Sequence, residues 1–238
     1  MITATRPSLR INALAVLVVL VGCTAEPGSG TPEEQAAAVA EALGPAWDAE
    51  VVEDARDGAF VVANPQDAEI WRLGEGTDAI AALTQGTPWA AFWLPSLNQA
   101  SSDRSNVRAV VVDTSTLADE VVSWQVNVNA TDPGLDLDPD ALADDLRTRF
   151  EAQGLEVDQA RTATWNDRSI ALVAFEVPAE VFGGQPRYIR QWYIAVDEPR
   201  AMWSLSCDAP AAPERTQELC RRGLEGFRIV APAAQDRA

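Results

Sequence analysis

The chain of 238 residues carries 36 acidic and 18 basic side chains, and every basic residue is Arg because the sequence has neither Lys nor His. A surface this acidic repels phosphate backbones, which argues against a nucleic-acid partner. Without His or Lys the chain cannot build a Ser-His-Asp or Cys-His centre, a Ser-Lys dyad or a phosphate-binding loop with its lysine. A carboxylate pair for glycoside hydrolysis stays open, but nothing selects one pair, so we expect a non-catalytic protein with no cofactor and no metal ion.

The N-terminus has the three parts of a signal peptide. Arg6 and Arg10 supply positive charge, and residues 11–21 form an apolar run that is too short to span a membrane as a helix. The run closes on Leu20-Val21-Gly22-Cys23, which resembles the lipobox of bacterial lipoprotein precursors. The alternative is an uncleaved N-terminal anchor with an incidental cysteine.

The lipobox resemblance implies that Cys23 becomes a lipidated N-terminus, palmitate included, after residues 1–22 are removed. It places the protein at the cell membrane, on the extracytoplasmic face, and residues 23–30 become a flexible tether. The mature chain then keeps 16 of its basic and all 36 of its acidic residues, a net charge of −20.

Lipidation of Cys23 leaves Cys207 and Cys220 as the remaining cysteines. In an oxidising compartment we expect a disulfide bond between them. The alternative, a zinc site, is disfavoured because two cysteines without any histidine make a poor zinc shell.

A helix is predicted over residues 31–44, where Thr31, Pro32 and Glu34 form an N-terminal capping sequence and Gly44 ends the helix. Residues 45–231 should fold as a single α+β domain, and residues 232–238 as a disordered tail. Strands are expected where Val and aromatic residues recur between turn residues, at 58–64, 69–73, 89–94, 107–113 and 120–129. In the last strand Trp124, Val126 and Val128 share one face, and Gln125, Asn127 and Asn129 share the other.

The densest acidic stretch is residues 132–140. Calcium binding there stays an alternative, because the spacing departs from that of a calcium loop. The simpler interpretation is a helix start, with Asp138 as the N-cap and Pro139 in the first helical position. That helix should continue to about Gln153.

Four strands are predicted after it, at 155–165, 168–177, 187–196 and 201–207. Turn residues at 166–167 and 197–199 should close two antiparallel hairpins, and a loop over 178–186 should join them. A last helix is expected from Pro213 to about Arg222, ending at Gly223, followed by a final segment over 227–230.

This order of a helix, a four-stranded meander and a terminal helix ending in Gly-Phe-Arg-Ile-Val resembles the second half of PsbP-like domains, over roughly residues 135–230. It is most similar to the LpqN-type lipoproteins of mycobacteria, and the Ala-rich, Arg-only composition suits an actinobacterial source. The resemblance implies an α/β/α sandwich, with an antiparallel sheet flanked by helices. It carries over no functional residues.

Two non-enzymatic functions remain. The first is an interaction or accessory module of the cell envelope with a protein partner; the second is a carrier of an apolar ligand such as a lipid or glycolipid. We expect a binding surface at Trp89, Phe92 and Trp93, because aromatics cluster there between two prolines and are enriched at binding hot spots. The loop that holds Phe182 is a second candidate. A buried central strand is the alternative for residues 89–94.

The lipobox predicts that Cys23→Ala leaves a larger, unprocessed precursor, because the signal peptidase for lipoproteins requires the cysteine. Wild-type protein should partition into detergent and incorporate labelled palmitate, as seen by gel mobility and acyl labelling. Normal processing of Cys23→Ala, together with an unlabelled wild type, would contradict the prediction.

Overall fold

The computed structural model describes residues 30–54, 57–100, 105–115, 120–130, 137–183, 185–197, 200–210 and 213–230. The predicted signal segment, most of the tether and the predicted tail lie outside them.

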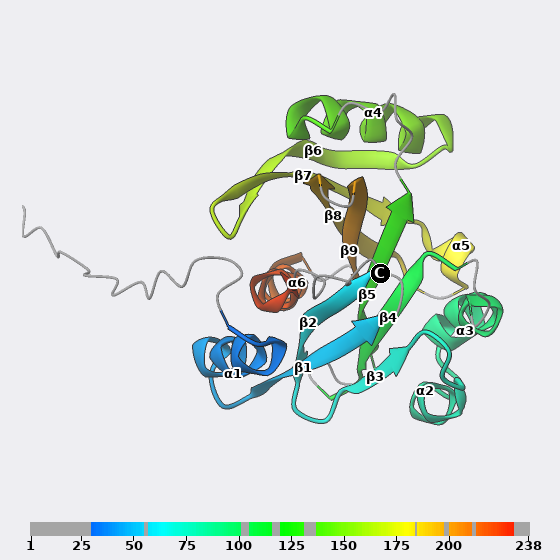
Figure 1. The fold of residues 1–238 in the computed structure, drawn as a ribbon. Coiled ribbons are helices and arrows are strands. Elements are labelled where there is room, and N and C mark those ends of the chain that lie inside the picture. Colours follow the sequence, from blue (N-terminus) through cyan, green and yellow to red (C-terminus); the bar gives the residue numbers. More distant parts are fainter. Residues whose placement is uncertain are drawn as a thin grey trace, which may run out of the picture.

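The fold is mixed α+β, with antiparallel sheets flanked by helices (Figure 1). No helix of the described residues is long and apolar enough to span a bilayer. In chain order the elements are α1 (Pro32–Leu43), β1 (Trp47–Asp54), β2 (Gly58–Pro65), β3 (Glu69–Arg72), α2 (Asp78–Leu83), α3 (Pro88–Ala100), β4 (Val107–Asp113), β5 (Val122–Ala130), α4 (Pro139–Ala152), β6 (Glu156–Trp165), β7 (Arg168–Val177), α5 (Ala179–Phe182), β8 (Arg187–Asp197), β9 (Arg200–Pro210), α6 (Pro213–Gly226) and β10 (Arg228–Ile229).

A seven-stranded sheet in the order β3-β4-β5-β9-β8-β7-β6 forms the centre of the molecule, and every neighbouring pair is antiparallel. The predicted meander over the last four long strands is confirmed. Asn166 and Asp167 close the β6–β7 hairpin at φ 46° and 60°. Such left-handed angles match the twist of a two-residue hairpin turn, and Asn and Asp tolerate them best after Gly.

One face of this sheet packs on the main hydrophobic core. A smaller sheet in the order β1-β2-β10, together with α1 and α6, covers this face of the large sheet. The large side chains between the two layers include Trp124, Trp203 and Phe60. The predicted Cys207–Cys220 disulfide is present and ties β9 to α6. Helix α1 begins with the predicted capping box, in which the Glu34 N–H donates to Thr31 Oγ1 over 3.3 Å, and it buries Ala36 and Val39 in this core.

Among the described residues, helices cover the two flanks of the opposite face but not its middle. Helix α4 lies along β6 and β7, where Leu142 and Leu146 pack against Phe175. Helices α2 and α3 lie against β3 and β4 at the other flank, where Ile80 and Trp89 pack in a third cluster (Figure 1). The three middle strands, β5, β9 and β8, lie between these flanks.

The prediction of a strand over residues 89–94 was wrong, because α3 runs from Pro88 to Ala100. Trp89 and Trp93 are four residues apart and share one face of a helix as readily as one face of a strand. Ala90 and Ala91 between them favour the helix. Pro95 lies inside α3, where it cannot donate to the carbonyl one turn earlier.

Three further differences concern the end of one helix and elements that were not predicted. Helix α6 continues through Gly223 to Gly226 and does not end at Gly223. The loop over 178–186 contains the short helix α5. Strand β1 and helix α2 were not predicted, because β1 reads as a charged sequence with few turn signals and α2 has only six residues.

Gly223 is inside a helix because Trp124 leaves no room for a side chain. A Cβ at this position would lie 1.8 Å from Trp124 Nε1, and Trp124 is itself buried in the main core. Ala normally stabilises a helix interior relative to Gly by about 1 kcal/mol. Here we expect Gly223→Ala to lower the free energy of unfolding by about 1–3 kcal/mol, because overpacking a core displaces buried rings.

Urea unfolding monitored by circular dichroism measures this change. The matched control is Gly76→Ala, whose added Cβ meets no atom within 4 Å, and it should change the free energy by less than about 0.5 kcal/mol. Equal behaviour of the two variants would refute the close contact between Gly223 and Trp124.

Candidate functional site

Polar side chains occupy the part of the large sheet that the helices leave open. The strand register places them in rows across β5, β9 and β8. One row is Gln125, Ser206 and Gln191, and the next is Asn127, Ser204 and Tyr193. The opposite face of the same strands carries Trp124, Val126, Trp203, Leu205, Trp192 and Ile194, all in the main core.

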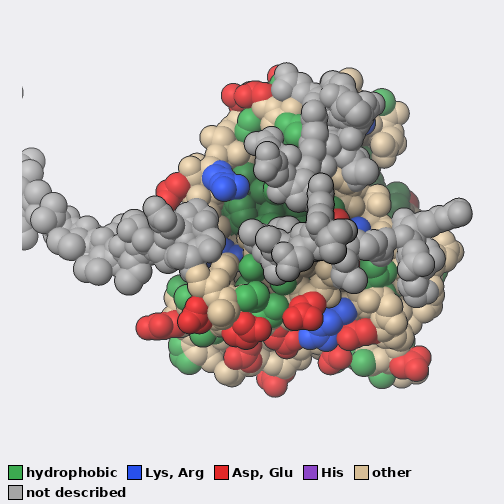
Figure 2. Space-filling view, viewed as in Figure 1, with side chains coloured by type: hydrophobic (Ala, Val, Ile, Leu, Met, Phe, Trp, Pro, Cys, Tyr) green, Lys and Arg blue, Asp and Glu red, His purple; other side chains and the backbone are tan. Residues whose placement is uncertain are grey.

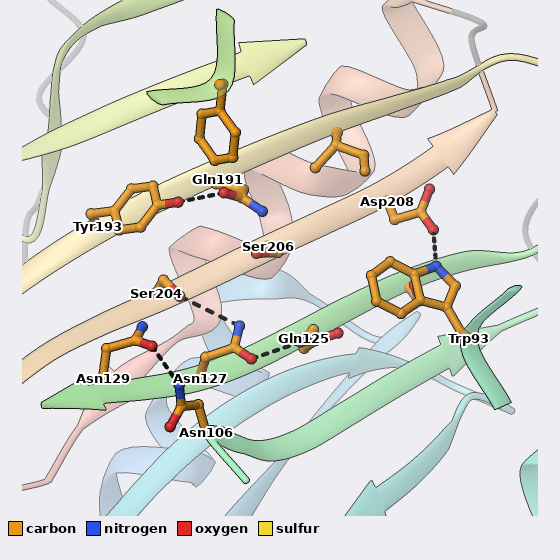
Figure 3. A pocket seen from close by; sticks show the side chains of 13 residues that line it. Trp93, Asn106, Gln125, Asn127, Asn129, Gln191, Tyr193, Ser204, Ser206 and Asp208 are labelled. Atoms are coloured by element: carbon orange, nitrogen blue, oxygen red, sulfur yellow. Dashed lines mark hydrogen bonds between the residues drawn. The ribbon is translucent and has the colours of Figure 1, made fainter. Parts of the chain in front are cut away.

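These rows form the floor of a groove of about 340 Å³ (Figure 3). Trp93 of α3 stands at one end, and Phe150 of α4 contributes from the other flank. The complete lining is Trp93, Asn106, Ser123, Gln125, Asn127, Asn129, Phe150, Ile189, Gln191, Tyr193, Ser204, Ser206 and Asp208. The volume lies in the range of small-molecule sites, which start at about 300 Å³.

Hydrogen bonds order part of the floor. Gln125 Nε2 donates to Asn127 Oδ1 over 2.6 Å, and Asn106 Nδ2 donates to Asn129 Oδ1 over 2.9 Å (Figure 3). The Tyr193 hydroxyl donates to Gln191 Oε1. These contacts fix the amide groups without using all their donors and acceptors, because each amide has two N–H groups and a carbonyl oxygen with two lone pairs.

Asp208 closes the floor beside Trp93 and is 4% exposed. The Arg187 Nε–H donates to Asp208 Oδ1 over 2.8 Å, and the Trp93 Nε1–H donates to Asp208 Oδ2 over 2.8 Å. Arg187 also donates to the Val121 carbonyl over 2.6 Å, which anchors its guanidinium. Burial raises the pKa of Asp208, and the charge and hydrogen bond of Arg187 oppose that rise.

The groove therefore presents a floor without free charge. Its two ionisable side chains are Asp208, which Arg187 neutralises, and Tyr193, whose pKa is raised by burial so that the phenol stays protonated. The rest of the lining offers amides, hydroxyls and ring faces. Such a surface is suited to neutral hydrogen-bonding groups.

The aromatic residues predicted as a binding surface divide between core and surface. Trp89 is 1% exposed and donates from Nε1 to Ser123 Oγ over 3.0 Å, so it is part of the core. Phe92 is 38% exposed, and its ring stacks on the buried ring of Phe182 at 4.3 Å between centroids. Trp93 is half-buried, meets Phe92 edge to face at 5.2 Å and lines the groove.

The structure thus joins the two predicted surfaces into one aromatic corner, defined as Phe92, Trp93 and Phe182, at the Asp208 end of the groove. The guanidinium of Arg187 lies 5.4 Å from the Phe182 ring centroid. Groove and corner therefore share the Trp93–Asp208–Arg187 contacts.

Sequence reasoning identified the polar face of β5 but missed its counterparts on β8 and β9. Ser204, Ser206 and Asp208 alternate with Trp203, Leu205 and Cys207, which is the same two-faced pattern as in β5. That alternation was the available signal. It does not say which strand pairs with β5.

The acidic stretch 132–140 lies partly outside the described residues, since 131–136 are not among them. Its end forms the predicted helix cap, where Asp138 Oδ1 accepts from the N–H groups of Asp140 and Ala141 at 3.1 and 3.2 Å. Within the described ranges no group of three or more acidic or cysteine residues could hold a metal ion.

No family model matches the chain, and neither does any curated protein. Solved structures show a distant likeness. The Ran-binding protein Mog1p of Saccharomyces cerevisiae is 14% identical, covering 77% of this chain and 96% of its own, with a TM-score of 0.44. A point mutant of protein Mog1 is 14% identical, covering 75% and 86%, with a TM-score of 0.39. Scores of this size transfer no partner to this chain.

The Arg187–Asp208 pair predicts a large loss of stability on truncation. We expect Asp208→Ala to lower the free energy of unfolding by about 3–5 kcal/mol, because it leaves the buried Arg187 charge without its carboxylate. Chemical unfolding followed by near-ultraviolet circular dichroism measures this loss.

Asp145→Ala is the matched control. Its partner Arg149 is 62% exposed at the side chain, and a surface pair contributes at most about 1 kcal/mol. Losses of similar size in the two variants would mean that the Arg187–Asp208 pair does not stabilise the sheet as proposed.

Proposed function

We propose that the chain is a membrane-anchored, extracytoplasmic lipoprotein that acts as a non-catalytic binding module of the cell envelope. The polar groove over β5, β9 and β8 is its binding site. The ligand is a neutral, hydrogen-bonding group of an envelope component. The lipobox at Cys23 supports the location, and the polar floor in the middle of a packed sheet supports the function.

The floor is the observation that carries the proposal. Elsewhere on the same face, β7 and β4 carry apolar residues that helices cover, among them Val173, Phe175, Val110 and Val112. Burying amides and hydroxyls under a helix without partners would cost about 1–3 kcal/mol each. A run of such groups between two helix-covered flanks is therefore stable only when water hydrates it or when a ligand supplies the missing hydrogen bonds.

The same lining disfavours an apolar ligand for this groove. A lipid carrier needs a large pocket with a predominantly apolar lining. The middle row of this floor, Gln125, Ser206 and Gln191, offers amides and a hydroxyl where a lipid chain would need apolar contacts. The two ionisable groups are similarly unsuited to acid-base catalysis, since Asp208 is held by Arg187 and Trp93 while burial keeps Tyr193 neutral.

We further propose that the fold is a variant of the PsbP-like domain. The support is the order of α4, the β6-β7-β8-β9 meander and α6, which matches the pattern expected from the sequence. Strands β3, β4 and β5 extend the sheet beyond the meander, and β5 supplies one side of the groove.

A steric block tests the binding site. Ser206 is half-buried in the middle of the floor, so Ser206→Phe would place a ring in the groove without displacing core atoms. We expect the full-length variant to keep its melting temperature within about 3 °C. After cross-linking in membranes, the variant should retain at most about one tenth of the amount of envelope component that the wild-type protein retains, as quantified by mass spectrometry.

Ser169→Phe is the matched control, because Ser169 is exposed on β7 outside the groove lining. It should retain the component as the wild type does. Retention by Ser206→Phe at the wild-type level, with the fold intact, would rule out the groove as the site.

A further inference from the structure

A second pocket lies on the opposite face of the large sheet, between the β6-β7-β8 strands and α6. Its volume is about 500 Å³. Leu172 and Trp192 form an apolar floor, and they are paired across β7 and β8. The remaining lining is Arg161, Ala163, Thr164, Arg190, Gln217, Glu218, Arg221 and Leu224.

Three arginines converge on this pocket although the chain has twice as many acidic as basic residues. The acidic residues gather elsewhere, for example over α1, β1 and β3 in the lower part of Figure 2. Arg221 is held by Glu218 over 2.7 Å and by Glu225, so its charge is balanced. Within the described ranges, no carboxylate comes within 4 Å of the guanidinium of Arg161 or Arg190.

Three other arginines of the large sheet do have carboxylate partners. Arg72, Arg108 and Arg187 each meet at least one carboxylate. In a chain so rich in acids, any exposed or half-buried guanidinium has many potential partners. Arg161 and Arg190 line one pocket, and neither has a carboxylate partner among the described residues. They therefore indicate a local excess of positive charge that an external anion would balance.

Arg190 carries the strongest evidence. Its Nε is buried, and no acceptor among the described residues meets it. The guanidinium lies 5.6 Å from the Tyr188 ring centroid, which is within the range of a cation–π contact. A buried, charged donor without an acceptor is costly to the fold. The guanidinium fork fits a phosphate or a carboxylate with two parallel hydrogen bonds.

We propose that this pocket is an oxyanion site, in which Arg190 and Arg161 bind a phosphate group above the Leu172–Trp192 floor. The site is independent of the polar groove, because the two lie on opposite faces of the sheet. The phosphate belongs either to a phospholipid headgroup of the membrane that carries the anchor or to a free phosphate ion. The two sources differ chemically, since the headgroup phosphate is a diester and the free ion carries no ester bond.

The test uses the full chain in a neutral detergent at low ionic strength, with ¹⁵N-labelled arginine side chains. Inorganic phosphate and, separately, sn-glycero-3-phosphoglycerol as the diester are titrated while the Nε–H signals are followed by NMR. We expect a saturable shift of the Arg190 signal with at least one of the two. Saturation by the diester assigns the headgroup, and saturation by inorganic phosphate alone assigns the free ion.

Arg190→Gln and Arg161→Gln should each weaken the binding by at least about tenfold, because each removes a charge-assisted contact. Arg190→Lys, which keeps the charge but loses the fork, should be intermediate. Arg149→Gln is the matched control: Arg149 is exposed and paired with Asp145, and its loss should leave the affinity unchanged.

Three results would overturn the proposal. The first is a lack of saturation with both compounds. The second is equal weakening by Arg149→Gln and Arg190→Gln, which indicates only a general charge effect. The third is wild-type affinity in a folded Arg190→Gln variant, with folding judged by its near-ultraviolet circular dichroism.

Discussion

The strict alternation of side chains along β5, β9 and β8 is the constraint on which the structure depends. Successive residues of a strand point to opposite faces, so a register shift of one residue would exchange the two faces completely. In these strands one face supplies Trp124, Trp203 and Trp192 to the main core, and the other supplies the polar rows. Burial of the tryptophan face therefore fixes the register, and the register in turn sets the amides and hydroxyls in rows.

The Arg187–Asp208 pair makes the groove compatible with a buried sheet. Without Arg187, a carboxylate that is 4% exposed at the end of β9 would have to be protonated or hydrated. With it, the pair forms a neutral end wall that also holds Trp93 of α3 in place. A hydrophobic pair of similar volume could be at least as stable. The retained ion pair thus has a positioning role, since its carboxylate accepts the indole N–H of Trp93, a contact that an apolar pair could not make.

Features encoded by neighbouring residues could be predicted, and those that depend on distant pairing could not. The Thr31–Glu34 capping box, the Asp138 cap and the Asn166-Asp167 turn act through local hydrogen bonds and backbone angles, so each was predicted correctly. Residues 89–94 were misassigned because positions four apart share a face in both a strand and a helix. The groove was missed because Gln125 pairs with Ser206, which lies 81 positions later in the chain, and no local pattern specifies such a pairing.

The two proposed sites differ in their relation to the proposed anchor. Seven residues separate Cys23 from Thr31, the N-cap of α1, and even fully extended this stretch reaches only about 25–30 Å. Helix α1 contacts α6, where Arg222 Nη1 donates to the Leu43 carbonyl over 3.0 Å, and α6 forms one wall of the arginine pocket. Helix α1, to which the proposed anchor is tethered, and the arginine pocket therefore lie on the same side of the large sheet. On a chain whose net charge repels an anionic bilayer, a basic pocket on that side would set the orientation of the domain against the phosphate layer. The neutral groove, on the other side of the sheet, would then stay open to the envelope.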